Sequence, residues 1–334
     1  MKRIIQIIIS IGLLILLFSW IDFKQITGVI ENLNYIYILI ALLIITLDRI
    51  LMGFKWNLLL RVRGIKISLF KATKVYYISN YLGLFLPPTI GTDLVRAYYV
   101  SQRNENTQDV LASIFIERYL GFIGLFFASL IGCIYFIDFI EFSKINDLFF
   151  IISALTILGT TSFIISFNYK LIDLFKVFIN RFSNKKFFWR VIPKIEKLID
   201  SYIYYKKHKK VLIYVMVLTL AEIFLVVLWS YVIALSLNIG ISLTYFAAFI
   251  PIVLFLIRLP ISLDGFGINE GTYVYFLGLI GVAETLAFSV GLINHFITIA
   301  AILPGGVFYA FDKGKVSISD IEKVEDRVVR NKNY

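Results

Sequence analysis

The chain has 334 residues, of which 59% are hydrophobic and only 16% charged, and its mean hydropathy is +0.85. Soluble domains carry about 25% charged residues, so this composition excludes an ordinary water-soluble globular protein. The net charge of +11 could suggest nucleic-acid binding, but the basic residues cluster in loops between apolar runs. This distribution indicates membrane topology and attraction to anionic headgroups, and we expect no nucleic-acid partner.

Cysteine and histidine are scarce in this chain. Cys133, the only cysteine, lies within an apolar run, and the only histidines are His208 and His295. One cysteine cannot form a disulfide within the chain, and two histidines disfavour a zinc or di-metal centre. We therefore expect no bound metal and no cofactor, and we assign no catalytic residues.

Apolar runs long enough to cross a bilayer, about 20 residues, follow one another along the chain. The N-terminal run Ile4–Trp20 ends without a small-residue cleavage site, so we interpret it as an uncleaved first span. Five further runs qualify: Tyr35–Leu60, Ile114–Ile137, Leu148–Phe167, Val211–Leu237 and Thr285–Phe311. The sequence lacks strand-like alternation, and the predicted fold class is an all-α polytopic membrane protein.

Two more apolar stretches, Leu69–Val100 and Leu243–Val282, contain helix-breaking residues. These are Pro87, Pro88 and Gly91 in the first stretch, and Pro251, Pro260, Gly265 and Gly267 in the second. Proline removes a backbone donor and ends or kinks a helix, so each stretch is expected to form two short half-helices around a turn. With these two, the chain has about eight membrane segments.

Loop charges predict the orientation, because cytoplasmic loops carry an excess of lysine and arginine. Basic residues crowd residues 61–74 and, most densely, 168–210, whereas the opposite connections are acidic or nearly uncharged. We expect a multi-pass protein of the cell membrane with both termini in the cytoplasm. Residues 1–311 would form a single bundle and 312–334 a short charged cytoplasmic tail.

The basic segment 168–210 also has apolar residues at helical spacing. This pattern is typical of helices that lie in the inner headgroup layer. The alternative is a solvated linker with some helix.

The number of membrane crossings before each interrupted stretch decides the side from which it enters. The first stretch would enter from the cytoplasm and the second from outside, so their orientations are opposite. If each enters the membrane and returns, a span, a re-entrant hairpin and a second span occur twice, in Tyr35–Ile137 and Val211–Phe311. Inverted repeats with interrupted helices near the midplane are the architecture of many secondary transporters. We therefore predict two re-entrant helical hairpins and an inverted repeat.

The first interruption carries residues suited to a phosphate group. Thr92 or Asp93 can cap a helix running toward Val100, and a helix start offers free N–H groups and partial positive charge. Arg96, about one turn further on, would add a bidentate contact. The alternative is a capped cytoplasmic helix on which Asp93 and Arg96 are solvated.

The second interruption places polar groups in an otherwise apolar stretch: Arg258, Asp264, Asn269 and Glu270. A charge at the membrane centre costs about 2.5–3.5 kcal/mol, so these groups should be paired, hydrated in a cavity or near a surface. Intramembrane charge indicates a functional site. The alternative is a surface loop between two ordinary spans.

Other charged residues within the spans give weaker signals. Glu222 is expected to face a cavity or a partner such as Arg258 or Arg118, and Asp48 and Arg49 are expected to pair with nearby groups. Glu117 and Arg118 are interpreted as an acid and an interfacial arginine at the start of a span. His295 is interpreted as a hydrogen-bonded core residue rather than a proton relay.

At the two interruptions the chain resembles the lysylphosphatidylglycerol synthase transmembrane (flippase-like) family, which includes the membrane half of the multiple peptide resistance factor. The resemblance lies in Asn80–Arg96 (NYLGLFLPPTIGTDLVR), Glu117–Gly121 (ERYLG) and Leu259–Gly271 (LPISLDGFGINEG), in that order and spacing. It implies a lipid-translocating bundle of about eight membrane segments, often associated with aminoacylated phosphatidylglycerol or lipid-linked sugars.

The chain departs from the family pattern in three places. The family's Gly-Gly-Asp is here Gly91-Thr92-Asp93, its second glycine pair is Asp264-Gly265, and its usual arginine before glutamate is Asn269. The last two changes make this site more acidic, which favours a zwitterionic or cationic headgroup. The soluble transferase domain of the full-length synthases does not follow the bundle here, so we expect no lysyl transfer by this chain alone.

Three functions remain open at this point. The first is a lipid flippase or transporter, not driven directly by ATP because the sequence lacks a Walker motif. Its substrate-binding residues would be Asp93, Arg96, Arg118, Arg258, Asp264, Asn269 and Glu270. The second is a scaffold whose partner is a lipid-modifying synthase or glycosyltransferase. The third is an enzyme acting on a lipid headgroup, for which the sequence offers no convincing nucleophile with its base.

Overall fold

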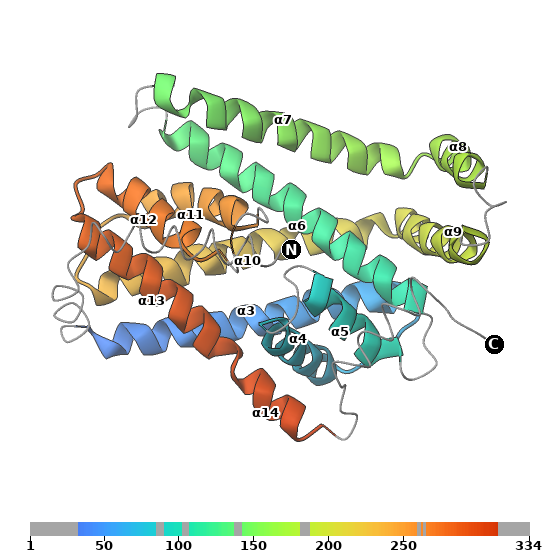
Figure 1. Ribbon diagram of the computed structural model, residues 1–334, viewed down its shortest axis with the longest axis horizontal. Helices are drawn as coiled ribbons and strands as arrows, with labels where there is room; N and C mark the ends of the chain where they lie inside the picture. The colour runs from blue at the N-terminus through green and yellow to red at the C-terminus, as the bar shows by residue number, and fades with distance from the viewer. Residues whose placement is uncertain are drawn as a thin grey trace. The chain divides into compact units, whose positions relative to one another are not determined.

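The computed structural model describes residues 33–84, 90–101, 107–136, 142–180, 188–258, 262 and 265–312 (Figure 1). The expected first span Ile4–Trp20, the residues Pro87, Pro88, Pro260 and Asp264, and the tail 313–334 lie outside these residues. All regular structure in the described part of the chain is helical. The prediction of an all-α protein is confirmed for this part.

Thirteen helices, one of them a short 3₁₀ helix, follow one another through the described residues. They are α3 (Tyr35–Val62), α4 (Leu69–Gly83), α5 (Ile90–Ser101), α6 (Thr107–Phe136), α7 (Phe142–Ser166), α8 (Tyr169–Asn180), α9 (Phe188–Tyr204), η1 (Tyr205–His208), α10 (Lys209–Ser236), α11 (Leu243–Ile257), α12 (Ile268–Gly278), α13 (Glu284–Ile302) and α14 (Pro304–Ala310).

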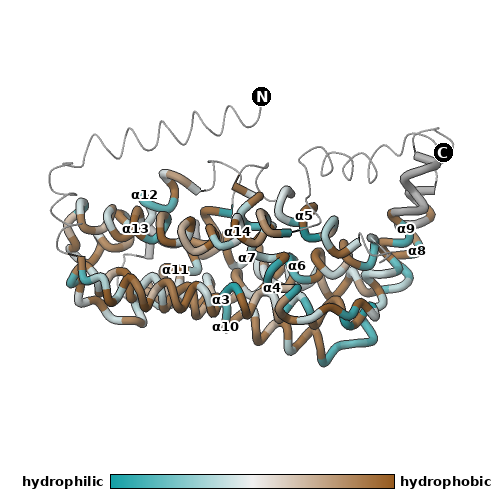
Figure 2. Tube along the Cα trace, turned by 90° about the horizontal axis from the view of Figure 1, so that it is seen from below, coloured by the Kyte–Doolittle hydropathy of each residue, from teal (hydrophilic) through white to brown (hydrophobic). Residues whose placement is uncertain are grey.

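Five helical stretches in the described residues are long and apolar enough to cross a membrane: Tyr35–Val62, Thr107–Phe136, Phe149–Ser166, Ile195–Ser236 and Glu284–Ala310. These correspond to the five internal spans expected from hydropathy, and hydrophobic residues extend along α3 and α10 in Figure 2. The protein is therefore a multi-pass membrane protein. At a rise of 1.5 Å per residue, α4, α5, α11 and α12 are each too short to cross a hydrocarbon core of about 30 Å alone.

Several boundaries differ from expectation. Pro251 was expected to interrupt its stretch, but α11 continues through it, because one missing backbone donor is tolerated in a helix whose other bonds remain. Gly91 was expected at the break, yet it lies inside α5, as do Thr92 and Asp93, the expected caps. The last expected span is divided at Leu303, where Pro304 begins α14.

The described chain groups into two compact units. Unit 1 takes its residues from Met1–Arg49, Gly124–Thr156 and Leu220–Leu303, and unit 2 takes its residues from Ile50–Ile123, Ile157–Thr219 and Pro304–Tyr334. The divisions fall within α3, α6, α7 and α10, each of which contributes to both units. The single bundle expected for residues 1–311 stays a prediction.

Unit 1 has α11 at its centre. Nine of the fifteen side chains of α11 are buried, and rings from α6, α11 and α12 pack together around Phe249 and Phe276. A Cβ on Gly132 of α6 would overlap the carbonyl oxygen of Ala248, so the two backbones are in direct contact. α12 packs against both α11 and α13.

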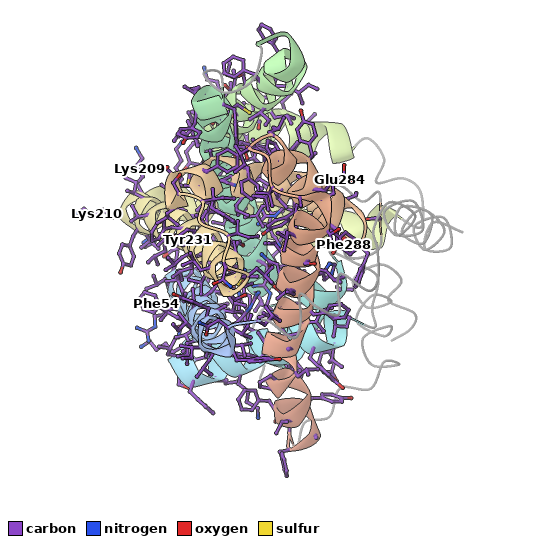
Figure 3. All side chains as sticks on the ribbon, turned by 90° about the vertical axis from the view of Figure 1, so that its left-hand side faces the viewer. Phe54, Lys209, Lys210, Tyr231, Glu284 and Phe288 are labelled. Atoms are coloured by element: carbon purple, nitrogen blue, oxygen red, sulfur yellow. The ribbon has the colours of Figure 1, made fainter. Side chains whose placement is uncertain are left out.

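Unit 2 is built around α4, which packs against α5 on one side and α14 on another. Its buried side chains include Trp56, Leu60, Ile78 and Val95. Apart from Asn168, the described residues of the basic segment 168–210 form α8, α9, η1 and the start of α10. The expected position of these helices in the inner headgroup layer stays a prediction. At that start, Lys209 and Lys210 extend outward (Figure 3) and are exposed.

One series of local features occurs twice in the chain. α3 and α10 each have 28 residues, and each ends before a residue with positive φ, Gly64 (78°) and Asn238 (57°). Four residues later a serine, Ser68 or Ser242, caps a helix of 15 residues, α4 or α11. The second series begins 174 residues after the first (209 − 35 and 243 − 69).

Candidate functional site

A cluster of charged side chains with a buried centre joins α4, α5 and α6 in unit 2. It consists of Asp93 and Arg96 on α5, Glu117 and Arg118 on α6, and Tyr76 on α4, and we name it the Arg96 cluster. The first turn of α5 supplies Asp93, and Arg96 follows on the same face one turn later (i, i+3). Adjacent positions on α6 supply the other two charges.

Arg96 is the centre of this cluster. Its Nη1 donates to Glu117 Oε2 at 2.6 Å and to the Tyr76 hydroxyl at 2.5 Å, and its Nη2 donates to Asp93 Oδ1 at 2.7 Å. The guanidinium also lies over the rings of Tyr76 and Trp56, at 4.5 and 5.1 Å from their centroids. Its side chain is only 2% exposed, so these contacts replace water around a charge that is costly to bury.

Arg118 occupies the exposed edge of the same cluster. Its Nη2 donates to Asp93 Oδ1 at 2.9 Å and its Nε donates to Asp93 Oδ2 at 3.1 Å, a bidentate pair. The Arg118 side chain is 46% exposed and that of Asp93 is 22% exposed. The cluster contains two acids and two arginines, and its charges sum to zero, with one cation and one anion at the accessible edge.

A second cluster lies in unit 1, where α12 begins beside the middle of α13. Glu270, on α12, is fully buried; its Oε2 accepts from the Gly267 N–H at 2.7 Å, and its Oε1 lies 2.9 Å from His295 Nδ1. The Asn269 side-chain amide donates to the Gly291 carbonyl at 2.9 Å. We name Asn269, Glu270 and His295 the Glu270 cluster.

The turn before α12 fixes this geometry. Gly265 and Gly267 have φ of 81° and 83°, values that suit glycine, and the Phe266 ring stacks on His295 with 3.8 Å between centroids. A Cβ on Gly291 would lie 3.0 Å from the Glu270 Cα, so α12 and α13 approach each other closely here.

Asn294, next to His295, links α13 to two more elements of unit 1. Its side-chain amide donates to Ser230 Oγ on α10 at 2.7 Å and to the Tyr273 hydroxyl on α12 at 2.6 Å. All three residues are buried. α13 therefore uses two consecutive polar side chains to hold α10 and α12.

The remaining expected site residues are placed as follows. Arg258 is exposed at the C-cap of α11, and Glu222 is partly buried on α10. Asp48 and Arg49 contact each other at 3.8 Å. The expected role of Arg96 as a direct phosphate contact stays a prediction, although the two Nη atoms already bond to Asp93, Glu117 and Tyr76.

Sequence reasoning missed two members of the Arg96 cluster. Glu117 was interpreted as an acid at a helix start, but α6 begins ten residues earlier, at Thr107, so Glu117 lies well inside the helix. Tyr76 gave no signal, because it is one of three tyrosines on α4, with Tyr77 and Tyr81, and the sequence does not distinguish it from them. A charged pair inside an apolar run was the available clue to Glu117.

These helices and buried clusters define an α-helical, multi-pass membrane protein with ionisable groups inside its helical core. The chain belongs to the family described as the lysylphosphatidylglycerol synthase TM region, whose model matches residues 3–306. It is similar to the UPF0104 membrane protein PH1989 of Pyrococcus horikoshii, with 23% identity over 318 residues, covering 89% of this chain and 93% of that protein. No solved structure matches the chain significantly.

Proposed function

We propose that this protein moves a lipid between the two leaflets of the cell membrane. The cargo would be a phospholipid such as aminoacylated phosphatidylglycerol, or a lipid-linked sugar. The observation that carries the proposal is the Arg96 cluster, whose accessible edge presents a cation and an anion within a membrane-embedded helical protein. Intramembrane charge of this kind marks substrate and ion pathways.

The repeated series of features supports a transporter architecture. α3 followed by α4, and α10 followed by α11, share helix lengths, turn residues and serine caps. The basic and acidic loops predict that the two series run in opposite directions across the membrane. An inverted repeat of this kind, with α4–α5 and α11–α12 as re-entrant hairpins, allows alternating access around a central path.

The edge of the Arg96 cluster suits a headgroup with a phosphate and an amine. Arg118 has the exposed guanidinium that a phosphate can bind through two parallel hydrogen bonds, and the partly exposed Asp93 can accept from an amine. Arg96, which is buried and bonds to Asp93, would position Asp93. Headgroup binding would then replace part of the contact between Asp93 and Arg118.

The test is reconstitution of the purified protein in liposomes with fluorescent phosphatidylglycerol or phosphatidylethanolamine in both leaflets. A membrane-impermeant quencher then reports how fast inner-leaflet lipid becomes accessible. We expect protein-dependent movement, and about a tenfold lower rate for Arg118→Gln, because a charge-assisted contact is worth about 1.5–3 kcal/mol.

Arg61→Gln is the matched control. Arg61 is also exposed and also bonded, through Asn57, but it lies outside the cluster and should leave the rate unchanged. Equal lipid accessibility with and without protein, for anionic, zwitterionic and aminoacylated headgroups and for a lipid-linked sugar, would rule out the proposal.

A scaffold function is the second candidate, favoured by the basic stretch from Lys206 to Lys210 at the junction of η1 and α10. As a scaffold the protein would hold a lipid-modifying synthase or glycosyltransferase. Charge reversal at Lys209 and Lys210 that abolishes function in cells, while Arg118→Gln does not, would favour the scaffold.

As a lipid transporter, the protein would move its lipid without modifying it chemically. Mass spectrometry of lipids incubated with the pure protein tests this point. A new lipid species that depends on Asp93 or Glu270 would favour a membrane-embedded enzyme.

A further inference from the structure

The Arg96 and Glu270 clusters occupy equivalent places in a repeated pair of helices. A shift of 177 residues (270 − 93) carries the charged residues of the Arg96 cluster on α5 and α6 onto polar residues of α12 and α13. The shift therefore relates α5–α6 to α12–α13, just as a shift of 174 relates α3–α4 to α10–α11. Residues of one cluster can be matched to the other by number.

We call Asp93–Arg118 and Glu270–His295 the outer pairs of the two clusters. Adding 177 to the residue numbers of the first outer pair gives those of the second. Asp93 corresponds to Glu270 and Arg118 corresponds to His295, and the two side chains of each pair are 2.9 Å apart. In both copies the first helix supplies the acid and the second helix supplies the base.

We call Arg96–Glu117 and Tyr273–Asn294 the inner pairs, and the same shift of 177 residues relates them. Arg96 corresponds to Tyr273 and Glu117 corresponds to Asn294, and each pair is joined by a hydrogen bond of 2.6 Å. Two neighbouring contacts between the same helices are thus kept under one shift, although all four residue types have changed. Shared descent of the two helix pairs explains this better than two separate coincidences.

The change of residue types alters the chemistry of the second copy. Its inner pair is neutral, and its outer base is histidine in place of arginine. Arginine keeps its charge over the physiological pH range, whereas histidine changes charge between about pH 5 and 8. The Asp93–Arg118 pair is therefore a permanent ion pair, and the Glu270–His295 pair becomes one only when the imidazole carries a second proton.

We propose that Glu270 and His295 form a proton-binding pair, the protonatable counterpart of Asp93–Arg118, and that the lipid movement proposed above is coupled to a proton at this pair. The coupling to lipid movement rests on the proposed function, whereas proton binding by the pair does not. The imidazole takes one proton from water on one side, with one N–H bond formed, and returns it to water on the other side. No other bond changes.

Because Glu270 and His295 are buried, the presence of this proton affects how firmly α12 packs against α13. With a protonated imidazole the pair carries no net charge, like its counterpart. Without that proton, the fully buried Glu270 carboxylate keeps the Gly267 N–H, the Asn269 amide and a neutral imidazole as its contacts among the described residues. A charge in such surroundings favours hydration. Proton release would therefore loosen the contact between the start of α12 and α13.

Other ionisable side chains lie on the elements of unit 1 that pack against the pair. Within the described residues these include Tyr273 and Tyr275 on α12, Glu284 on α13, Arg258 and Tyr245 on α11, Glu222 and Tyr231 on α10, and Cys133 and Tyr135 on α6. Tyr273 bonds to Asn294. Glu284 is exposed in the first turn of α13 (Figure 3), so Glu284→Gln provides a matched control for Glu270→Gln.

The first experiment measures protonation without transport. The chain has only two histidines, so the NMR spectrum of protein with isotope-labelled histidine contains two imidazole signals, and His208→Gln assigns them. We expect the His295 signal to report gain of a proton as the pH falls, and this response to differ in Glu270→Gln but not in Glu284→Gln. A His295 signal that does not change between about pH 5 and 8, or that ignores Glu270→Gln, overturns the pair.

The second experiment measures lipid movement in the same liposomes with and without a pH gradient. We expect the initial rate to change about tenfold across the range in which histidine titrates, in the wild type and in His208→Gln. His295→Arg, which restores the residue of the first copy, and His295→Gln should both lose this dependence. Lipid movement that ignores the gradient overturns the coupling but leaves the transport function intact.

Absence of lipid movement under every condition, together with a His295 titration that depends on Glu270, would overturn the proposed function and the coupling while supporting the proton-binding pair. The two failures are therefore distinguishable.

Discussion

The two clusters stabilise charged groups inside an apolar helical protein by different contacts. Around Arg96, permanent cations match permanent anions, and three side chains from α4, α5 and α6 surround one guanidinium. Around Glu270, a backbone N–H, an amide and an imidazole surround one carboxylate. The first arrangement is neutral at any physiological pH, while the second needs a proton to be neutral. The charges of the first cluster therefore do not depend on pH in the physiological range, whereas the net charge of the second does.

The largest difference between the clusters should appear at their inner pairs. Arg96→Met leaves Glu117 buried without its cation and should destabilise the protein by about 3–5 kcal/mol. The equivalent change, Tyr273→Phe, removes one hydrogen bond from Asn294 and should cost about 1–2 kcal/mol. Denaturant or thermal unfolding in detergent measures both. Equal losses would mean that the ion pair contributes no more than a neutral contact.

A smaller effect should follow from the close approach of α12 and α13. Gly291→Ala places a methyl group against Glu270 and Tyr273 and should destabilise by about 1–3 kcal/mol through overpacking. Gly271→Ala is the matched control, since its methyl group would meet no atom within 4 Å, and alanine is favoured over glycine in a helix by about 1 kcal/mol. If both variants unfold alike, the Glu270 cluster is looser than the structure indicates.

The smallest effect on stability should come from the outer pair of the first cluster. Arg118→Gln breaks an exposed ion pair, which is typically worth about 0–1 kcal/mol. Its cost should shrink further as salt concentration rises, because Arg118 is 46% exposed. A loss as large as that of Arg96→Met would show that Arg118 supports the fold and would weaken its assignment to a headgroup.

Sequence patterns predicted the five internal spans but not the contacts between the helices. The internal spans followed from hydropathy, because length and apolarity are averaged over many residues. Which side chains meet depends on the rotation of each helix, and a shift of one residue turns a helical position by about 100°. For that reason the bonds of Arg96 with Glu117 and Tyr76, and of Glu270 with His295, could not be derived from spacing alone.

Among the described residues, glycine and proline predicted a helix break correctly only where the backbone takes a conformation that suits glycine. Gly265 and Gly267 precede α12 with positive φ, whereas Pro251 lies within α11, where the helix continues through it. His295 was expected to be a hydrogen-bonded core residue, and it is buried beside Glu270. The chemistry of this pair became visible only when α12–α13 could be compared with α5–α6.

The match between His295 and Arg118 has a consequence at the level of genes. Histidine and arginine codons can differ by a single base, so a point mutation can turn a pH-responsive copy into a permanently charged one, or the reverse. Selection could therefore adjust the response of such a protein to acidity without remodelling its helices. A relative that carries arginine at the position of His295 is expected to work equally well across the pH range in which this protein changes its rate.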